Sequence, residues 1–149
     1  MVFESSVPLN PERIRAAAVY CSDGRFGLQF DEFLQNHLRL PRYDRLAIPG
    51  GPACLAAHFS TFREEEAAVE ELRFLVEVHQ LESVVLIAHQ NCAFYTQRLQ
   101  TPELQLETQQ REDMQKAISR VQSISGNLEI QTFFARVHDD GTIRFEVVS

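Results

Sequence analysis

Short continuous apolar runs alternate along the chain with longer segments in which apolar residues recur at helical spacing. The runs at 16–21 and 83–89, and the segment at 44–51, predict buried strands, because an uninterrupted apolar run suits a strand that is covered on both faces. The segments at 26–40 and 62–80 carry their apolar residues on one face of a helix. This part of the chain therefore predicts strands and helices in alternation.

The rest of the chain predicts one more helix and a hairpin. Residues 101–125 have helical periodicity in their second half, and the Gly-Asn pair at 126–127 ends the helix. Residues 128–148 indicate a hairpin, with the Asp-Gly pair at 140–141 as its turn. This order indicates an α/β fold: a mainly parallel central sheet of about four strands flanked by helices, with an antiparallel C-terminal strand. We expect residues 1–149 to form a single domain.

Composition and charge narrow the classes of partner. The 149 residues are 44% hydrophobic and 23% charged, and 14 basic against 21 acidic residues give a formal net charge of -7. Clustered lysines and arginines bind phosphate backbones, and their absence here disfavours nucleic acid. No segment approaches the roughly 18 uncharged apolar residues of a membrane span, and the N-terminus lacks the pattern of a signal peptide. We therefore expect a cytoplasmic protein that binds neither nucleic acid nor membranes.

The three cysteines, Cys21, Cys54 and Cys92, lack the dense, even-numbered spacing of a disulfide framework. Reduced thiols are therefore expected, available for chemistry or for a metal. In open α/β sheets, ligands bind beyond the carboxyl ends of the strands. Cys21 ends the first predicted strand and His89 ends the third, with Cys92 in the next turn. These side chains are therefore expected to share one edge of the sheet.

Two thiolates and one imidazole form the ligand set of a catalytic zinc site, whose fourth tetrahedral position holds water or substrate. We therefore interpret Cys21, His89 and Cys92 as ligands of one Zn²⁺ per chain. Zinc held in this way lowers the pKa of its bound water to roughly 7 and produces a nucleophile at neutral pH. Asp23 and Arg25 follow Cys21 at alternate positions. A bond to the guanidinium would keep the carboxylate off the metal and leave it free to orient that water.

Each of these motifs also has a purely structural interpretation. A cysteine at the end of a buried strand can be a small core residue, and Asp23 and Arg25 can be a turn residue and a surface ion pair. Cys54, in the loop after the second strand, is expected to be a buried structural thiol, with a reactive thiol or an alternative metal ligand as the other possibilities. Glu64–Glu66 predict the solvated start of a helix. Three histidines are expected at surface or boundary positions: His37, His58 and His138.

The segments CSDGR at 21–25 and HQNC at 89–92 resemble the C-x-D-x-R and H-x-x-C motifs of the β-class carbonic anhydrases. The resemblance implies that the two cysteines and the histidine of these motifs hold zinc, with the aspartate–arginine pair beside them. It implies reversible hydration of carbon dioxide to bicarbonate. It also implies a parallel sheet with an antiparallel last strand, and a homodimer or higher homo-oligomer.

Two departures from the family pattern concern the wall of the predicted pocket. Ile48–Pro52 stands where family members usually have a stretch like R-N-A-G-N, and Ala88 and Ala93 replace the glycines that flank H-x-x-C. These changes leave the metal ligands intact but alter the pocket wall, so they affect which substrate the site accepts. Two other functions therefore stay open: zinc-dependent hydrolysis of carbonyl sulfide or carbon disulfide, and a non-catalytic zinc-binding descendant of the family. It also stays open whether Asp23 pairs with Arg25 or binds zinc at rest.

Overall fold

The structure is a computed structural model that describes residues 1–148. Its strands are β1 (Ala16–Tyr20), β2 (Asp44–Ala47), β3 (Ser83–His89), β4 (Glu129–Val137) and β5 (Ile143–Val147). Its α-helices are α1 (Gly27–Glu32), α2 (Phe62–His79) and α3 (Leu106–Ile124). Shorter turns of π type are η1 (Phe33–His37) and η4 (Phe94–Arg98), and those of 3₁₀ type are η2 (Gly51–Leu55), η3 (Phe59–Thr61) and η5 (Glu103–Gln105).

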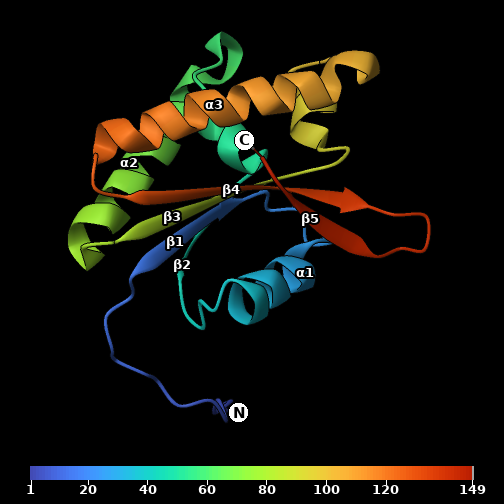
Figure 1. Ribbon diagram of the computed structural model, residues 1–149. Helices are drawn as coiled ribbons and strands as arrows, with labels where there is room; N and C mark the ends of the chain where they lie inside the picture. The colour runs from blue at the N-terminus through green and yellow to red at the C-terminus, as the bar shows by residue number, and fades with distance from the viewer. Residues whose placement is uncertain (149) are drawn as a thin grey trace.

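The strands of the described residues form one sheet in the order β2-β1-β3-β4-β5. β1 pairs in parallel with β2 and with β3, β3 pairs in parallel with β4, and β5 is antiparallel to β4. Helices α2 and α3 cover one face of this sheet, and α1 covers the other (Figure 1). The predicted α/β fold, with its parallel strands and antiparallel last strand, is therefore confirmed.

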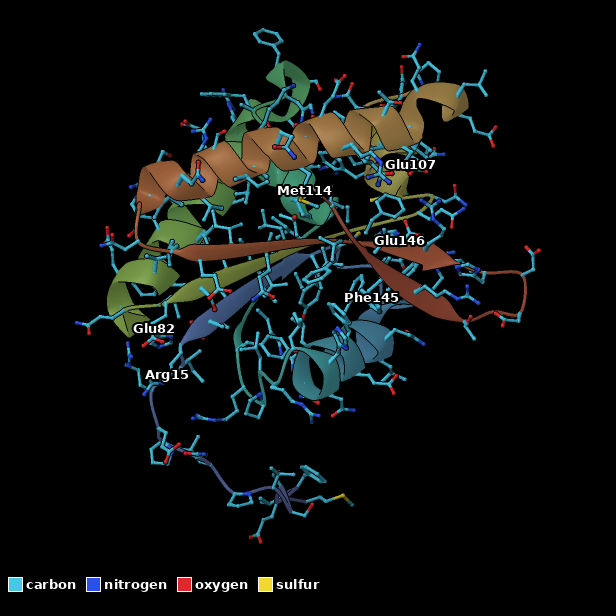
Figure 2. The ribbon with its side chains drawn as sticks, viewed as in Figure 1. Arg15, Glu82, Glu107, Met114, Phe145 and Glu146 are labelled. Atoms are coloured by element: carbon cyan, nitrogen blue, oxygen red, sulfur yellow. The ribbon has the colours of Figure 1, made fainter. Side chains whose placement is uncertain are left out.

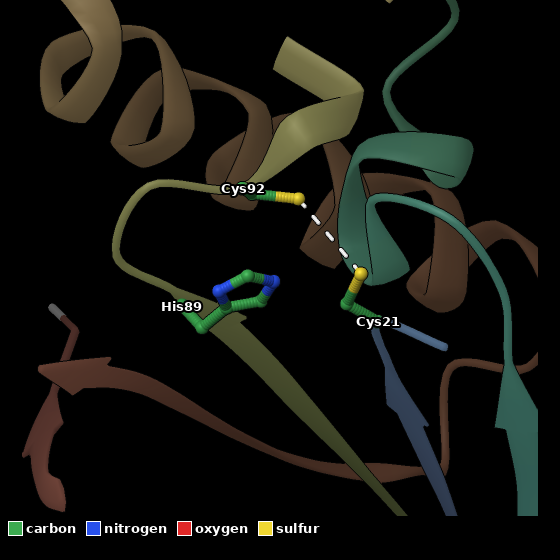
Figure 3. Close-up of side chains that lie close together, drawn as sticks. All are labelled: Cys21, His89 and Cys92. Atoms are coloured by element: carbon green, nitrogen blue, oxygen red, sulfur yellow. Dashed lines mark hydrogen bonds between the residues drawn. The ribbon is translucent and has the colours of Figure 1, made fainter. Parts of the chain in front are cut away.

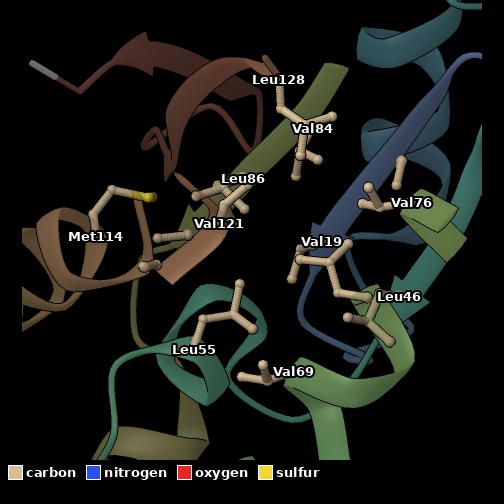
Figure 4. Packing of buried hydrophobic residues seen from close by; sticks show 14 of the residues in the cluster. Val19, Leu46, Leu55, Val69, Val76, Val84, Leu86, Met114, Val121 and Leu128 are labelled. Atoms are coloured by element: carbon tan, nitrogen blue, oxygen red, sulfur yellow. The ribbon is translucent and has the colours of Figure 1, made fainter. Parts of the chain in front are cut away.

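The apolar runs are buried because both faces of the central strands are covered. In β1, Ala17 and Val19 face the layer of α2 and α3, whereas Tyr20 faces α1, and no residue of this strand is more than 5% exposed. Figure 4 shows how side chains from the sheet, η2, α2 and α3 meet in the first layer. Met114 reaches this layer from α3, whereas Phe145 of β5 packs on the side of α1 (Figure 2).

The helices differ in detail from the prediction. The helix expected at 26–40 is regular only over Gly27–Glu32, and it then widens into η1, where the Leu38 N–H bonds to the Phe33 carbonyl at 3.0 Å. Phe33 and Leu34 both stay buried in this wider turn, so the apolar periodicity persists while the hydrogen-bond pattern changes. Within residues 1–148, no helix is long and apolar enough to cross a membrane.

The expected solvent exposure of the Glu64–Glu66 run is wrong for Glu65, which is buried, whereas His58 lies at a boundary position, as expected. The Glu65 residue is 3% exposed, and the His58 side chain is 14% exposed. His58 Nδ1 lies 2.5 Å from Glu65 Oε1, and Nε2 lies 2.7 Å from Asp113 Oδ2. Tyr95 donates a hydrogen bond of 2.8 Å to the same Asp113 oxygen. We call these four residues the His58 cluster; it joins a loop, α2, α3 and η4.

The direction in which strands are added to the sheet reverses between β1 and β3. These two strands are neighbours in the sheet, although β2 comes between them in the sequence. In α/β sheets, such a reversal leaves space for ligands outside the carboxyl ends of the two strands. Cys21 directly follows β1, and His89 is the last residue of β3. Two of the predicted metal ligands are therefore located at the reversal.

Candidate metal centre

Cys21, His89 and Cys92 lie together at the carboxyl ends of β1 and β3 (Figure 3). One ligand atom from each residue lies within 4.8 Å of the other two, and the two sulfur atoms are 3.9 Å apart. All three residues are buried, with exposed fractions of 8%, 1% and 1%. The structure thus brings together the three residues that the sequence analysis interprets as metal ligands.

The spacing of the sulfur atoms suits a tetrahedral zinc ion. Two sulfurs that each lie about 2.3 Å from a tetrahedral zinc are about 3.8 Å apart, close to the 3.9 Å between Cys21 Sγ and Cys92 Sγ. The convergent group found among residues 1–148 consists of these two cysteines and His89. A set of three protein ligands leaves one tetrahedral position for water or a substrate.

Hydrogen bonding around His89 leaves one ring nitrogen available for a metal. Nδ1 lies 2.8 Å from the Gln90 carbonyl oxygen, which only accepts hydrogen bonds, so Nδ1 carries the proton. Nε2 then has a free lone pair; it is buried, with no hydrogen-bond partner among the described residues. Native structures rarely leave a buried polar atom unpaired without an unseen ion, water or function to explain it. The donor set and this nitrogen therefore fit a metal ion.

A hydrogen bond between the two thiols separates their pKa values. Cys92 Sγ donates to Cys21 Sγ, and this bond lowers the pKa of Cys21 to about 4 although the residue is buried. The same bond, together with burial, raises the pKa of Cys92. The backbone N–H groups of Gly50 and Asp23 near this sulfur lower the pKa of Cys21 further. Cys21 is therefore favoured as a thiolate, the form that binds metals.

The loop after β2 passes close to Cys21 because it contains two glycines. At Gly51, with φ +53°, a Cβ atom would lie 2.8 Å from the Cys21 backbone nitrogen. At Gly50, with φ +84°, a Cβ atom would lie 2.7 Å from the Phe94 ring. Only glycine adopts such positive φ angles at little cost. The stretch at 48–52 that departs from the family pattern therefore packs its backbone directly against a candidate ligand.

Asp23 and Arg25 form a bidentate ion pair. Arg25 Nη2 lies 2.7 Å from Asp23 Oδ2, Arg25 Nε lies 3.1 Å from both carboxylate oxygens, and the Arg25 backbone N–H donates to Oδ1 at 3.0 Å. These bonds lower the pKa of Asp23 to about 2, so the carboxylate is ionised at neutral pH. The ligand group found among residues 1–148 does not include Asp23. Of the two arrangements left open by the sequence, the structure has Asp23 paired with Arg25.

Cys54 is a buried thiol outside the ligand group of residues 1–148. Its Sγ donates a hydrogen bond of 3.0 Å to the Pro49 carbonyl, and the residue is 5% exposed. Burial raises the pKa of Cys54 to about 12, so it stays a neutral thiol at physiological pH. These contacts favour the structural interpretation of Cys54 over a reactive thiol or a metal ligand.

Three residues that support His89 were not predicted from the sequence. The carbonyl of Gln90 fixes the imidazole, and its side-chain oxygen accepts a 2.9 Å bond from the Val137 N–H. Gln110 donates a 2.8 Å bond from α3 to the His89 carbonyl. Phe26 lies against the imidazole, with 4.3 Å between the ring centroids. One signal was available for Gln110, a polar residue on the apolar face of a predicted helix.

The fold and the ligand group together define a class of protein: an α/β protein whose Cys-His-Cys group could hold a metal. The model of a protein family described as "Putative carbonic anhydrase" matches residues 12–148. The chain therefore belongs to this carbonic anhydrase family. The resemblance inferred from the two sequence motifs is confirmed.

Solved structures of carbonic anhydrases share the fold. The carbonic anhydrase from Glaciozyma antarctica is 18% identical, with a TM-score of 0.58 over 94% of this chain and 85% of that chain. The β-carbonic anhydrase isoform I from Trichomonas vaginalis is 14% identical, with a TM-score of 0.56 over 97% of this chain and 88% of that chain. At such low identity these similarities establish the architecture. No curated protein matches the chain significantly.

Proposed function

We propose that this protein is a zinc-dependent carbonic anhydrase that interconverts carbon dioxide and bicarbonate. One Zn²⁺ per chain would be held by Cys21, His89 and Cys92, and when bound it would activate water as a nucleophile at neutral pH. The observation that carries the proposal is His89 Nε2, a buried nitrogen without a hydrogen-bond partner among the described residues, which belongs to a group with two cysteine sulfurs. Membership of the carbonic anhydrase family supports the same activity.

Asp23 would orient the reacting water, and Arg25 would keep Asp23 in position. Three N–H groups of Arg25 already donate to the carboxylate: the backbone N–H, Nε and Nη2. A carboxylate offers about four lone-pair positions, and the single Nε hydrogen is shared between both oxygens at 3.1 Å each, so the three donors leave room for one hydrogen bond from water. The bidentate geometry also holds both oxygens in a fixed plane, which keeps the carboxylate from turning freely toward the metal.

Exchange of isotopically labelled oxygen between carbon dioxide and water tests the proposed reaction. Protein loaded with zinc is expected to accelerate the exchange, and protein treated with a chelator is expected to lose that acceleration. Two variants serve as controls. Asp23→Asn is expected to lose the acceleration because it changes the site, whereas Cys54→Ser changes a buried thiol outside the ligand group and is expected to keep it; loss of activity in both variants would indicate a general loss of folding. Zinc-loaded protein that leaves the exchange rate unchanged would refute carbonic anhydrase activity.

Hydrolysis of carbonyl sulfide or carbon disulfide is a second candidate function. The observation that favours it is the glycine-containing loop at 48–52, whose backbone packs against Cys21 where the family usually has a polar stretch. Release of sulfide from either compound by zinc-loaded protein measures this activity directly. Zinc-loaded protein that turns over neither carbon dioxide nor the sulfur analogues would instead be a non-catalytic zinc-binding member of the family.

A further inference from the structure

A surface hollow of about 260 Å³ lies beside the candidate metal centre. Its lining residues are Arg25, Phe26, Gln90, Asn91, Val137 and Ile143. Two of them follow Cys21 in its loop, and two directly follow His89, so the hollow lies over the same strand ends as the ligands. A larger hollow of about 670 Å³ lies between α1, η1 and β5, and none of its lining residues is next to a ligand in sequence. The smaller hollow is therefore the better candidate for an entry route.

Phe26 connects this hollow to one of the candidate ligands, because it lines the hollow and contacts His89. Its ring centroid is 4.3 Å from that of the His89 imidazole, with an angle of 37° between the planes, and Phe26 also lines the hollow. The residue is only 6% exposed, so most of the ring is held inside the protein. Its other aromatic neighbour among the described residues is Phe30, whose ring stacks on it with 5.7 Å between the centroids.

The backbone on both sides restricts the position of Phe26. Its N–H bonds to the Asp23 carbonyl at 3.1 Å, which closes the turn that contains Arg25. Its carbonyl accepts the Phe30 N–H at 2.9 Å, in the first turn of α1. These bonds restrict the backbone at Phe26, and contacts with Phe30 and His89 orient its ring. The ring of Phe26 is thus packed into the wall of the hollow.

We propose that Phe26 is a specificity-determining residue, which covers His89 at the base of this hollow and restricts access to the metal centre to small, slender molecules. The inference rests on the proposed function, because it concerns which molecules reach the metal. The apolar side chains of Phe26, Val137 and Ile143 line the hollow and suit an uncharged substrate. Linear molecules of three atoms fit such a restriction, whereas esters and other bulky substrates of zinc hydrolases would require Phe26 to move aside.

Labelling of the cysteines tests this inference without using enzymatic activity. Metal-free full-length protein is treated with iodoacetamide, a small reagent, or with fluorescein maleimide, a bulky one, and mass spectrometry locates the label. The quantity compared is the labelling ratio, the rate of labelling by fluorescein maleimide divided by the rate of labelling by iodoacetamide. In Phe26→Ala this ratio is expected to rise at Cys21 and Cys92 by about tenfold or more, the size discrimination typical of an apolar wall. Cys54 is an internal control because it is buried in the neighbouring loop and does not line the hollow.

The Phe33→Ala variant is the matched control, because Phe33 is also a buried phenylalanine on the α1 side of the sheet. An unchanged ratio of the two rates in Phe26→Ala, or an equal rise in Phe33→Ala, would overturn the inference. If labelling of Cys54 shows that Phe26→Ala loosens the whole region, Phe26→Leu decides. A higher ratio at Cys21 and Cys92 without any change at Cys54 is then required, and any other result overturns the inference.

The same samples separate failure of this inference from failure of the proposed function. If wild-type protein hydrates carbon dioxide but the labelling ratio does not respond to Phe26, the restriction by Phe26 is refuted and the enzyme activity stands. If the labelling ratio responds but zinc-loaded protein shows no turnover, only the proposed function is refuted.

Discussion

The position of the Asp23 carboxylate depends mainly on Arg25. Arg25 supplies the N–H groups that hold the carboxylate. The Arg25 side chain is 76% exposed and the Asp23 side chain is 20% exposed. Ion pairs this close to water contribute little to stability, typically under about 1 kcal/mol. We therefore expect the pair to matter for turnover much more than for folding.

Replacement of Asp23 by asparagine keeps the size of the side chain but removes its charge. We expect Asp23→Asn to bind zinc as the wild type does and to lose roughly 100-fold or more in turnover, the usual contribution of a positioned proton acceptor. Zinc content and oxygen exchange are measured on the same preparation. Glu12→Gln is the control, because it removes a carboxylate that is 82% exposed on the N-terminal segment. Turnover of Asp23→Asn at the wild-type rate would show that Asp23 has no such role.

Gly51 leaves no space for a side chain beside the backbone of Cys21. A Cβ atom there would lie 2.8 Å from both the Cys21 nitrogen and the Tyr20 carbonyl carbon, at a φ of +53°. We expect Gly51→Ala to lower the free energy of unfolding by about 2 kcal/mol, a typical value for one strained residue, and to weaken zinc binding. Gly24→Ala is the control, because no atom lies within 4 Å of a Cβ at that position. Urea denaturation and zinc titration measure both effects, and equal behaviour of the two variants would contradict the close packing.

Among the helices, α2 and α3 are joined by the His58 cluster. Hydrogen bonding to Asp113, opposed by burial, raises the pKa of His58. Burial raises the pKa of Glu65, whereas hydrogen bonds from His58 and Tyr95 outweigh burial and lower that of Asp113. Lys116 Nζ also lies 3.7 Å from Asp113 Oδ1. The cluster is therefore most stable with His58 protonated and Asp113 ionised.

The raised pKa of His58 predicts a loss of stability at alkaline pH. The folded protein binds this proton more tightly than the unfolded chain, so its stabilisation is complete below the ordinary pKa of 6.5 and is lost as pH rises through the raised value. Glu65 acts in the same direction, because its pKa is also raised. The free energy of unfolding from urea denaturation is therefore expected to fall with rising pH.

The His58→Gln variant tests the source of this pH dependence. Removal of one partner from a buried charged pair is expected to lower stability by about 3 kcal/mol at neutral pH, and the difference from wild type should shrink as pH rises. His37→Gln, at an exposed histidine, is expected to keep the wild-type pH dependence. A constant difference between His58→Gln and wild type across this pH range would contradict the role of the protonated imidazole.

The regular elements were predictable where a simple periodicity determines them. The runs AAAVY and SVVLIAH indicate strands because both of their faces are buried. The π turn at Phe33–His37 was not predictable, because burial of Phe33 and Leu34 suits either kind of helix. The burial of Glu65 was not predictable either, because its partner His58 is held by Asp113, which is 55 residues from His58 and comes from another helix.

At the level of the whole molecule, the sequence predicted the arrangement of the ligands better than their surroundings. Parallel strands bring Cys21 and His89 to one edge of the sheet, so the strand order alone is sufficient to place them together. The neighbours of the site follow from packing between distant segments: Phe26 against His89 and Gln110 against the His89 carbonyl are examples. Such contacts leave no periodic signal in the sequence. The residues that surround the ligands could therefore be identified only from the structure.

We also expect the chain to assemble into a homodimer or a higher homo-oligomer, as its resemblance to β-class carbonic anhydrases implies. Symmetric assemblies of identical chains are the commonest form of oligomer, and pairs are commonest among them. Sedimentation equilibrium of zinc-loaded protein is expected to give a mass of at least two chains. A single-chain mass at all concentrations would contradict this expectation.

Zinc content is the measurement that tests the metal centre most directly. Elemental analysis of purified protein is expected to find about one zinc per chain in the wild type and in Cys54→Ser, and little in Cys92→Ser, because a structural or catalytic zinc site depends on each of its protein ligands. Cys54 and Cys92 are both buried thiols, and only Cys92 belongs to the ligand group. Full retention of zinc by Cys92→Ser, or absence of zinc from wild-type protein purified with the metal present, would contradict the assignment of Cys21, His89 and Cys92 as ligands.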